Sequence, residues 1–182
     1  GNKLIATIAD GASFEWDSDG STSTRATLIT SAPTASRLSL VSTPDRHLVY
    51  FGTETTIGTT STQDDMYIRW SDQEDINTYT PTATNTAGTQ RIADGTRIVG
   101  AISGRDAIYV WTDNALFIMR FVGAPFTFSF QQVGTGCGLI GKNAAVEVDG
   151  SAYWMSDNGF FRYTGKLESL ACLVEDYVFD DL

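Results

Sequence analysis

Alternating apolar and polar residues predict β-strands along most of the chain. The clearest run begins at residue 97, where the apolar segments 97–102, 107–112 and 116–122 are separated by the short polar turns GRD and DNA. In the next segment, 123–134, phenylalanine alternates with small or polar residues, as in a strand that buries one face. These four segments predict an antiparallel, four-stranded meander.

The two central strands of this meander recur at a constant offset of 44 residues. AIYVWTDNALFIMRF at 107–121 is followed by SAYWMSDNGFFRY at 151–163, so an apolar strand, a polar turn and a second apolar strand return in register. An isolated hairpin is only marginally stable in water, and a repeated one therefore predicts units that stack and share a core. The predicted structural repeat comprises Tyr109, Trp111, Asp113, Asn114, Tyr153, Trp154, Asp157 and Asn158.

A four-stranded unit of about 44 residues has the period of a β-propeller blade. The spacing of the tryptophans, Trp16, Trp70, Trp111 and Trp154, is similar, and one buried indole per blade would anchor each sheet on its neighbour. The fold predicted is therefore all-β, a propeller that is complete or incomplete, with blades of about 44 residues. A β-sandwich is the structural alternative, although it gives no reason for the constant offset.

Three regions are expected along the chain. Residues 1–60 carry short apolar segments among serine, threonine and glycine, and predict one or two less regular blades; residues 61–165 contain the repeated blades. Residues 166–182 place apolar side chains at steps of three and four, which predicts an amphipathic C-terminal helix. Because the chain begins with Gly1 and lacks a helix-ending signal at its end, it is expected to be part of a longer polypeptide.

Composition and charge argue against several classes of function. The 182 residues have a formal net charge of -10, which does not favour a nucleic-acid-binding surface. The one histidine, His47, precedes a strand and is expected to be an ordinary edge residue rather than a catalytic base. Cys137 and Cys172 have no metal-binding spacing and are expected to be free thiols. The sequence thus predicts no enzyme, no bound metal or other cofactor, and no membrane insertion.

The polar loop between Gln73 and Thr89 is the candidate interface. It is long, contains Pro81 and Gly88 as breakers, and follows a predicted strand. Loops of this length are either functional or mobile surface segments, and both readings stay open. The residues singled out for contacts are Asp72, Glu74, Asp75 and Tyr79.

Several of these segments resemble a group of bacteriophage virion proteins. The resemblance covers about residues 66–181 and is most specific in RWSDQED with the following TYTPT, in CGLIGKNA, in YWMSDNGFFRY and in VEDYVF. The group comprises propeller-bearing tail components of tailed double-stranded DNA phages, namely nozzle or hub proteins and DNA-stabilising stoppers. The first 60 residues add little to it.

The resemblance implies a non-enzymatic structural protein of the tail. Such a protein assembles in the host cytoplasm, resides in the virion, and forms a ring of its own copies with other tail or portal-adaptor proteins around the channel through which DNA is ejected. Carboxylates lining such a channel would repel phosphate, so DNA would pass without specific binding. The alternative is a propeller that binds or cleaves host-surface glycans in the manner of a sialidase, because DSDGSTS and SDNGFF resemble parts of the sialidase blade turn.

Overall fold

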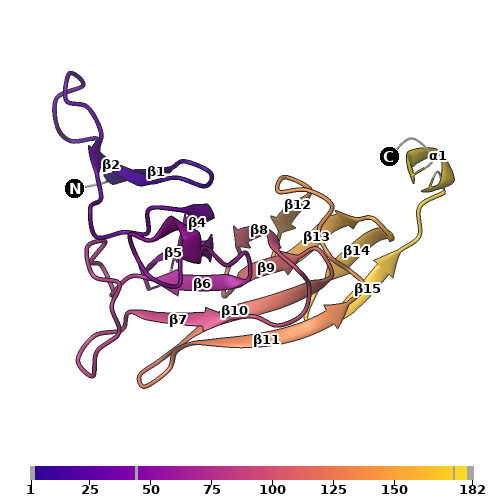
Figure 1. Ribbon diagram of the computed structural model, residues 1–182. Helices are drawn as coiled ribbons and strands as arrows, with labels where there is room; N and C mark the ends of the chain where they lie inside the picture. Colours follow the sequence, from indigo (N-terminus) through magenta and orange to yellow (C-terminus); the bar gives the residue numbers. More distant parts are fainter. Residues whose placement is uncertain (1–2, 44, 174, 180–182) are drawn as a thin grey trace. The chain divides into compact units, whose positions relative to one another are not determined.

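The computed structural model describes residues 3–43, 45–173 and 175–179 (Figure 1). The fold is all-β and propeller-like: in the described residues the strands form three four-stranded sheets and one three-stranded sheet, each an antiparallel meander of consecutive strands. The chain divides into two compact units, Gly1–Ile92 (unit 1) and Ala93–Leu182 (unit 2). The expected boundary near residue 60 lies within one sheet of unit 1.

Unit 1 contains the three-stranded sheet and one four-stranded sheet. The first comprises β1 (Lys3–Thr7), β2 (Ser13–Asp17) and β3 (Thr27–Leu28). The second comprises β4 (Ser36–Val41), β5 (Leu48–Thr53), β6 (Tyr67–Trp70) and β7 (Gly88–Arg91), with a short 3-10 helix at Thr60–Thr62 between β5 and β6. Of the strands before residue 60, β1–β3 thus form the three-stranded sheet, and β4 and β5 belong to the four-stranded one.

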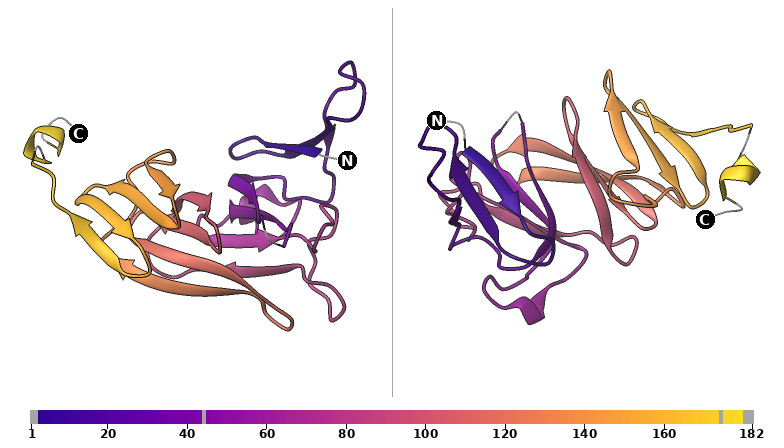
Figure 2. Two further views of the ribbon diagram at one scale, coloured as in Figure 1. Left: turned by 180° about the vertical axis from the view of Figure 1, so that it is seen from behind. Right: turned by 90° about the horizontal axis from the view of Figure 1, so that it is seen from above.

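Unit 2 contains two four-stranded sheets (Figures 1 and 2). One comprises β8 (Ile98–Ser103), β9 (Ile108–Thr112), β10 (Ala115–Gly123) and β11 (Thr127–Thr135). The other comprises β12 (Ala145–Val148), β13 (Ser151–Ser156), β14 (Gly159–Tyr163) and β15 (Leu167–Leu170). The two meanders predicted from the 44-residue offset are confirmed.

The strands β9 and β10 are buried on both faces. Their sequences, IYVWT and ALFIM, are continuously apolar rather than alternating, which is the pattern of a strand covered on both sides. Every residue of β9 is buried, and so are the first five of β10. The central hairpin of this sheet is therefore the best-packed part of unit 2.

The C-terminal segment differs from the expected helix. Residues Leu167–Leu170 form β15, which pairs with β14, and among the described residues the helix α1 spans Glu175–Phe179. Leu167 and Leu170 are three residues apart, so they suited one helical face, but in a strand they point to opposite faces. Cross-strand pairing with Tyr163 and Phe160 outweighs the local helical pattern. Val174 and Leu182, which the helical pattern included, lie outside the described residues.

The tryptophans do not occupy one equivalent position per sheet. Trp111 and Trp154 are on the second strands of their sheets, whereas Trp70 is on the third strand of its sheet. Trp16, on β2, is only half-buried. The tryptophan spacing was therefore a weaker guide to the repeat than the hairpin alignment.

Candidate functional site

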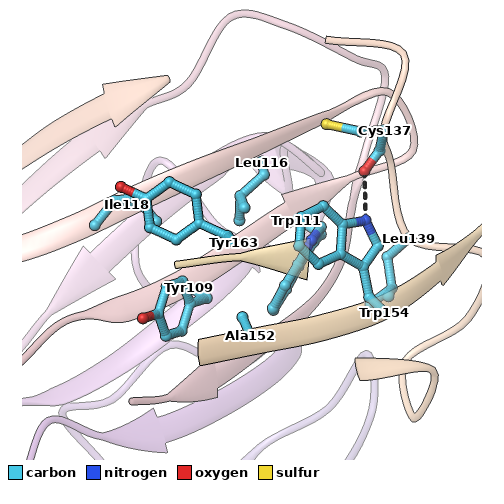
Figure 3. Packing of buried hydrophobic residues seen from close by; sticks show 9 residues of the cluster. All are labelled: Tyr109, Trp111, Leu116, Ile118, Cys137, Leu139, Ala152, Trp154 and Tyr163. Atoms are coloured by element: carbon cyan, nitrogen blue, oxygen red, sulfur yellow. Dashed lines mark hydrogen bonds between the residues drawn. The ribbon is translucent and has the colours of Figure 1, made fainter. Parts of the chain in front are cut away.

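The repeated hairpins build the shared core of unit 2. Tyr109 and Trp111 of β9 face Trp154 of β13 and Tyr163 of β14 across the gap between the two sheets (Figure 3). The Trp111 and Trp154 ring centroids are 5.4 Å apart, and those of Tyr109 and Tyr163 are 6.1 Å apart. Because aromatic pairs at such distances contribute beyond the area that they bury, the repeat residues hold sheet against sheet.

The polar turn of the first hairpin is tied into its surroundings. Asp113 accepts hydrogen bonds from the backbone N–H of Thr96, at 2.7 Å, and from the Thr96 hydroxyl. Burial opposes ionisation of Asp113, but these bonds outweigh it and hold the pKa of the carboxyl below its usual value. The Asn114 Nδ2 donates to Asp94 Oδ1 at 2.5 Å and to Thr135 Oγ1 at 2.9 Å. This turn therefore connects the segment before β8 with the end of β11.

The matching turn of the second hairpin is more open. Asp157 and Asn158 are exposed, and the one side-chain hydrogen bond described there runs from Ser156 Oγ to Asp157 Oδ1 at 2.9 Å. Tyr153 points to the face of its sheet opposite to Trp154, since successive side chains of a strand alternate. The eight repeat residues thus do not converge on one site.

The glycine-rich connection between the two sheets links the hairpins. Backbone N–H groups of Cys137 and Leu139 donate to the carbonyls of Asn114 and Thr112, both at 3.0 Å, and Trp154 Nε1 donates to the Cys137 carbonyl at 2.8 Å. A Cβ at Gly138 would lie 2.2 Å from the Asp113 carbonyl oxygen. Glycine at 138 is needed for this close backbone approach, whereas Gly136 in the same connection adopts a positive φ.

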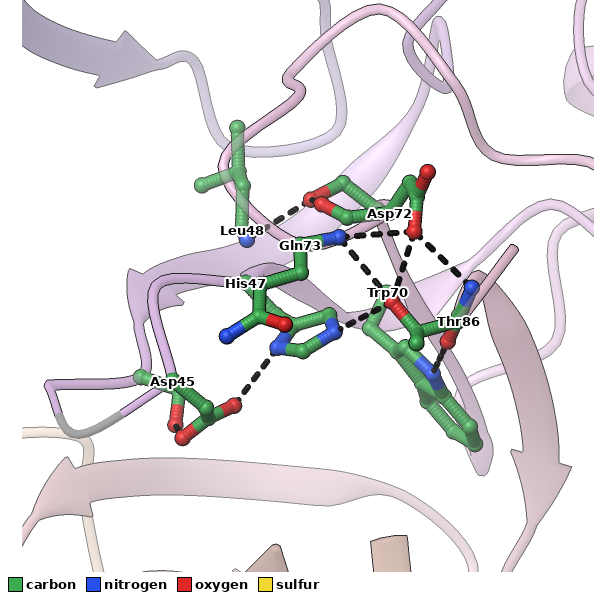
Figure 4. A network of polar contacts seen from close by, with 9 residues as sticks. Asp45, His47, Leu48, Trp70, Asp72, Gln73 and Thr86 are labelled. Atoms are coloured by element: carbon green, nitrogen blue, oxygen red, sulfur yellow. Dashed lines mark hydrogen bonds and ion pairs between the residues drawn. The ribbon is translucent and has the colours of Figure 1, made fainter. Parts of the chain in front are cut away.

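The candidate interface loop is clamped at its base by Asp72. One carboxylate oxygen, Oδ1, accepts from Thr86 N at 2.8 Å, from Thr86 Oγ1 at 2.6 Å and from Gln73 N at 2.9 Å (Figure 4). These hydrogen bonds, those from Thr86 first, hold the pKa of Asp72 below its usual value. Asp72 therefore joins the two ends of the loop.

A buried histidine continues this network. His47, expected at a strand edge, is fully buried, with Nδ1 2.6 Å from Asp45 Oδ2 and Nε2 2.9 Å from Thr86 Oγ1. Asp45 also accepts from the Ser42 hydroxyl. The sequence hint was the short spacing of Asp45 and His47 before β5, but Thr86 is 39 residues away and could not be inferred.

Asp45, His47 and Thr86 are linked in the order carboxylate, imidazole, hydroxyl, which is also the order of a hydrolytic triad. In a triad the hydroxyl is free to give its proton to the imidazole and to attack a substrate. Here Thr86 Oγ1 lies 2.6 Å from Asp72 Oδ1, to which it donates, and also accepts from Gln73 N at 3.0 Å. The arrangement fixes the loop against β5 and β6 and does not present a nucleophile.

Of the other predicted interface residues, Glu74 is exposed, Asp75 is half-buried and Tyr79 is buried. Glu74 and Asp75 line an open groove of about 880 Å³ in unit 1, where Glu74 forms an ion pair with Arg46 at 3.0 Å. Tyr79 is a correction to the sequence interpretation: it is 2 % exposed and packs edge-to-face on Tyr50, with ring centroids 5.7 Å apart. Burial raises the pKa of the Tyr79 hydroxyl. Tyr79 anchors the loop and is not available to a partner.

Two of the arginines that could grip an acidic sugar, Arg37 and Arg69, are engaged by other groups. Arg37 forms ion pairs with Asp10 and Asp65, both at 2.9 Å. Arg69 is buried and donates to the carbonyls of Tyr79, Glu54 and Thr55. Tyr163, the tyrosine at the end of β14, lies in the core of unit 2. None of these side chains is presented to a glycan carboxylate.

In the described part of the chain, no group of three or more histidine, cysteine, aspartate or glutamate side chains could hold a metal ion. No helix in those residues is long and apolar enough to cross a membrane.

Among known proteins, no family matches the sequence, and no curated protein matches it either.

Proposed function

We propose that the chain is a non-enzymatic structural protein of a bacteriophage tail, of the nozzle or hub type. It works in the virion as a ring of identical copies around the channel through which DNA is ejected. The observation that carries the proposal is the pair of consecutive four-stranded meanders in unit 2, joined through Trp111 and Trp154. Stacked meanders leave few free sheet edges and make a stiff body, which suits a mechanical part of a particle.

The surface charge supports passage of DNA without binding. Carboxylates outnumber Lys and Arg by 22 to 12. Five of the cations are held in surface ion pairs, so they are not free to replace the counterions of phosphate: Lys3, Arg37, Arg46, Arg91 and Arg162. A channel lined by this chain would repel the DNA backbone at every position rather than hold it at one.

The side-chain network around Thr86 favours the same proposal over catalysis. The hydrogen-bonding atoms of this network hold the loop in place, and Arg37 and Arg69 are engaged by other groups. The glycan-binding alternative needs a free cationic grip on an acidic sugar. It therefore has less support than a structural role.

The proposal is tested on particles produced from the genome that encodes the chain. Purified virions are digested, and peptides of this chain are quantified against the major capsid protein by mass spectrometry. We expect the chain in virions at a fixed low copy number, as for a single ring. Its absence from virions, or binding of the isolated chain to sialylated glycans, contradicts the proposal.

A further inference from the structure

The hairpin of β10 and β11 extends beyond the sheet to which it belongs. In β10, the residues that pair with β9 are Leu116–Met119, whereas pairing with β11 continues as far as Gly123, opposite Thr127. The outer part of the hairpin is therefore a two-stranded ribbon, and Figure 1 shows its turn lying beyond the ends of β8 and β9. Residues 121–126, at the end of this ribbon, are called the hairpin tip below.

The hairpin tip is apolar and open. Its sequence is FVGAPF, in which Phe126 is 76 % exposed, Val122 is 53 % exposed and Phe121 is 41 % exposed. The turns that join β9 to β10 and β13 to β14 carry Asp-Asn instead. Contiguous exposed apolar side chains on a folded protein indicate an interaction surface.

The turn of the hairpin tip has a defined conformation. The Phe121 ring packs edge-to-face on Phe128, with ring centroids 5.8 Å apart. The backbone N–H of Phe128 donates to the Phe126 carbonyl at 2.7 Å, and Gly123 adopts a positive φ of 75°, as glycine does readily. The exposed apolar side chains are therefore held in place by the turn.

These apolar side chains lie on both faces of the ribbon. Phe121 and Val122 are successive residues of β10, so their side chains point to opposite faces. Phe126 lies in the turn itself, between the two strands. One flat protein surface cannot cover both faces and the end of a projecting ribbon. A lipid bilayer can, because it surrounds an inserted turn on every side.

The charges near the hairpin tip suit a bilayer surface. Although the chain has 22 carboxylate side chains, none occurs between Asp113 and Glu147, where the charged residues are Arg120 and Lys142. Arg120 is exposed, and within the described residues it forms no ion pair. A cation of this kind can contact the phosphates of lipid headgroups, and no neighbouring carboxylate in this stretch opposes that contact.

The spacing of Arg120 and Val122 matches the depth of an interfacial contact. Alternate residues of a strand share a face, so Arg120 lies on the same face as Val122 and about 7 Å back along β10. Apolar groups that bind at a bilayer surface are buried about 5–10 Å into the boundary between headgroups and acyl chains. When Val122 reaches the acyl chains, the Arg120 guanidinium is therefore level with the phosphates.

We propose that the hairpin tip inserts shallowly into the surface of a lipid bilayer, with Phe121, Val122 and Phe126 among the acyl chains and Arg120 at the phosphates. The backbone of the turn stays near the headgroups, where water satisfies its polar groups. This departs from the sequence expectation of no membrane insertion, because a turn enters an interface without a spanning segment. The inference goes beyond the proposed function and does not depend on it.

Vesicle binding by matched variants tests the insertion. Val122→Ser with Phe126→Ser, the tip variant, removes the two most exposed large side chains of the tip. Val146→Ser with Val148→Ser is the matched control, because these side chains are 54 % and 51 % exposed on β12. We expect the wild-type chain and the control to sediment with phosphatidylcholine vesicles. The tip variant should partition at least tenfold more weakly, since burying one such side chain contributes about a factor of ten or more.

A fluorescent variant locates the hairpin tip independently. Phe126→Trp keeps an aromatic ring, and its emission, after subtraction of the wild-type signal, reports on position 126. We expect a blue shift when phosphatidylcholine vesicles are added, and quenching when their acyl chains are brominated. Circular dichroism checks the fold of every variant, and Phe126→Ser alone replaces the tip variant if the double substitution does not fold.

Three results would overturn the inference: a wild-type chain that does not sediment with vesicles, a control that loses as much binding as the tip variant, or an unquenched tryptophan at 126. Normal vesicle binding by the tip variant, together with its loss from virions, would assign the tip to a protein partner and also overturn it. Vesicle binding by a chain that is absent from virions would support the insertion and contradict the proposed function.

Discussion

The indole rings of Trp111 and Trp154 lie 5.4 Å apart between the two sheets of unit 2, although the two residues are not equivalent in the repeat. At the 44-residue offset Trp111 aligns with Met155, and Trp154 is one position earlier. Side chains alternate along a strand, so this shift of one residue places the two indoles on opposite faces of equivalent hairpins. When equivalent sheets stack in the same orientation, opposite faces meet, and the two tryptophans come into contact.

The two tryptophans should respond differently to substitution. Trp154 Nε1 donates to the Cys137 carbonyl, whereas no partner for the buried Trp111 Nε1 is found in the described residues. We expect Trp154→Phe to reduce the free energy of unfolding by about 1 kcal/mol more than Trp111→Phe, because it alone breaks a hydrogen bond. Urea unfolding monitored by circular dichroism measures the difference. Equal losses would mean that the Cys137 contact contributes nothing.

Gly138 should tolerate no side chain. The Cβ of Gly138→Ala would lie 2.2 Å from backbone, and backbone cannot swing aside as a flexible side chain does. We expect a loss of about 1–3 kcal/mol in the free energy of unfolding. Gly141→Ala is the control, because a Cβ there meets nothing within 4 Å. If both variants unfold at the same urea concentration, the close approach at Gly138 does not affect the free energy of unfolding.

The Thr86 hydroxyl should be needed for the loop clamp. Thr86→Val keeps the shape but removes the group that contacts both His47 and Asp72. We expect a loss of about 1–3 kcal/mol, since the buried His47 ring and the partly buried Asp72 carboxylate lose a partner. Thr86→Ser retains the hydroxyl and should recover most of that stability. Failure of serine to recover it would assign the effect to the Thr86 methyl group instead.

The same clamp should weaken in acid. The pKa of Asp72 is lower in the folded chain than the ordinary aspartate value of 3.8, so the ionised carboxylate contributes stability that is complete above the unfolded pKa. That stability is lost as the pH falls through the folded pKa. We expect amide exchange of Thr86 and Gln73 to accelerate, relative to the chemical rate, below about pH 4. In Asp72→Asn this acceleration should be absent, and its persistence would point to other carboxylates.

The sequence predicted the fold where a local pattern decided the structure. The meanders of unit 2 followed from apolar runs and short polar turns, which are local features, and from the repetition of that pattern 44 residues later. The segment 167–170 was predicted wrongly because four residues, LESL, fit a helical step of three as well as a strand, and pairing with β14 decides between them. A pairing partner of that kind is not visible in the segment itself.

The buried polar network could not be predicted from the sequence, for the same physical reason. Tyr79 stands in a polar loop, yet it is buried because Tyr50 of β5 offers an aromatic contact from 29 residues earlier in the chain. The His47 ring is positioned by Asp45 nearby and by Thr86 far along the chain. Long-range contacts of single side chains leave no periodic signal, so the site could be assigned only from the structure.

Cryo-electron microscopy of intact particles is the decisive test of the proposed ring of stacked meanders in a phage tail. We expect a ring of copies coaxial with the tail channel, into which this sequence can be traced, with carboxylates toward the lumen. A separate propeller at the tip of a fibre, with an open pocket lined by free arginines, would contradict it.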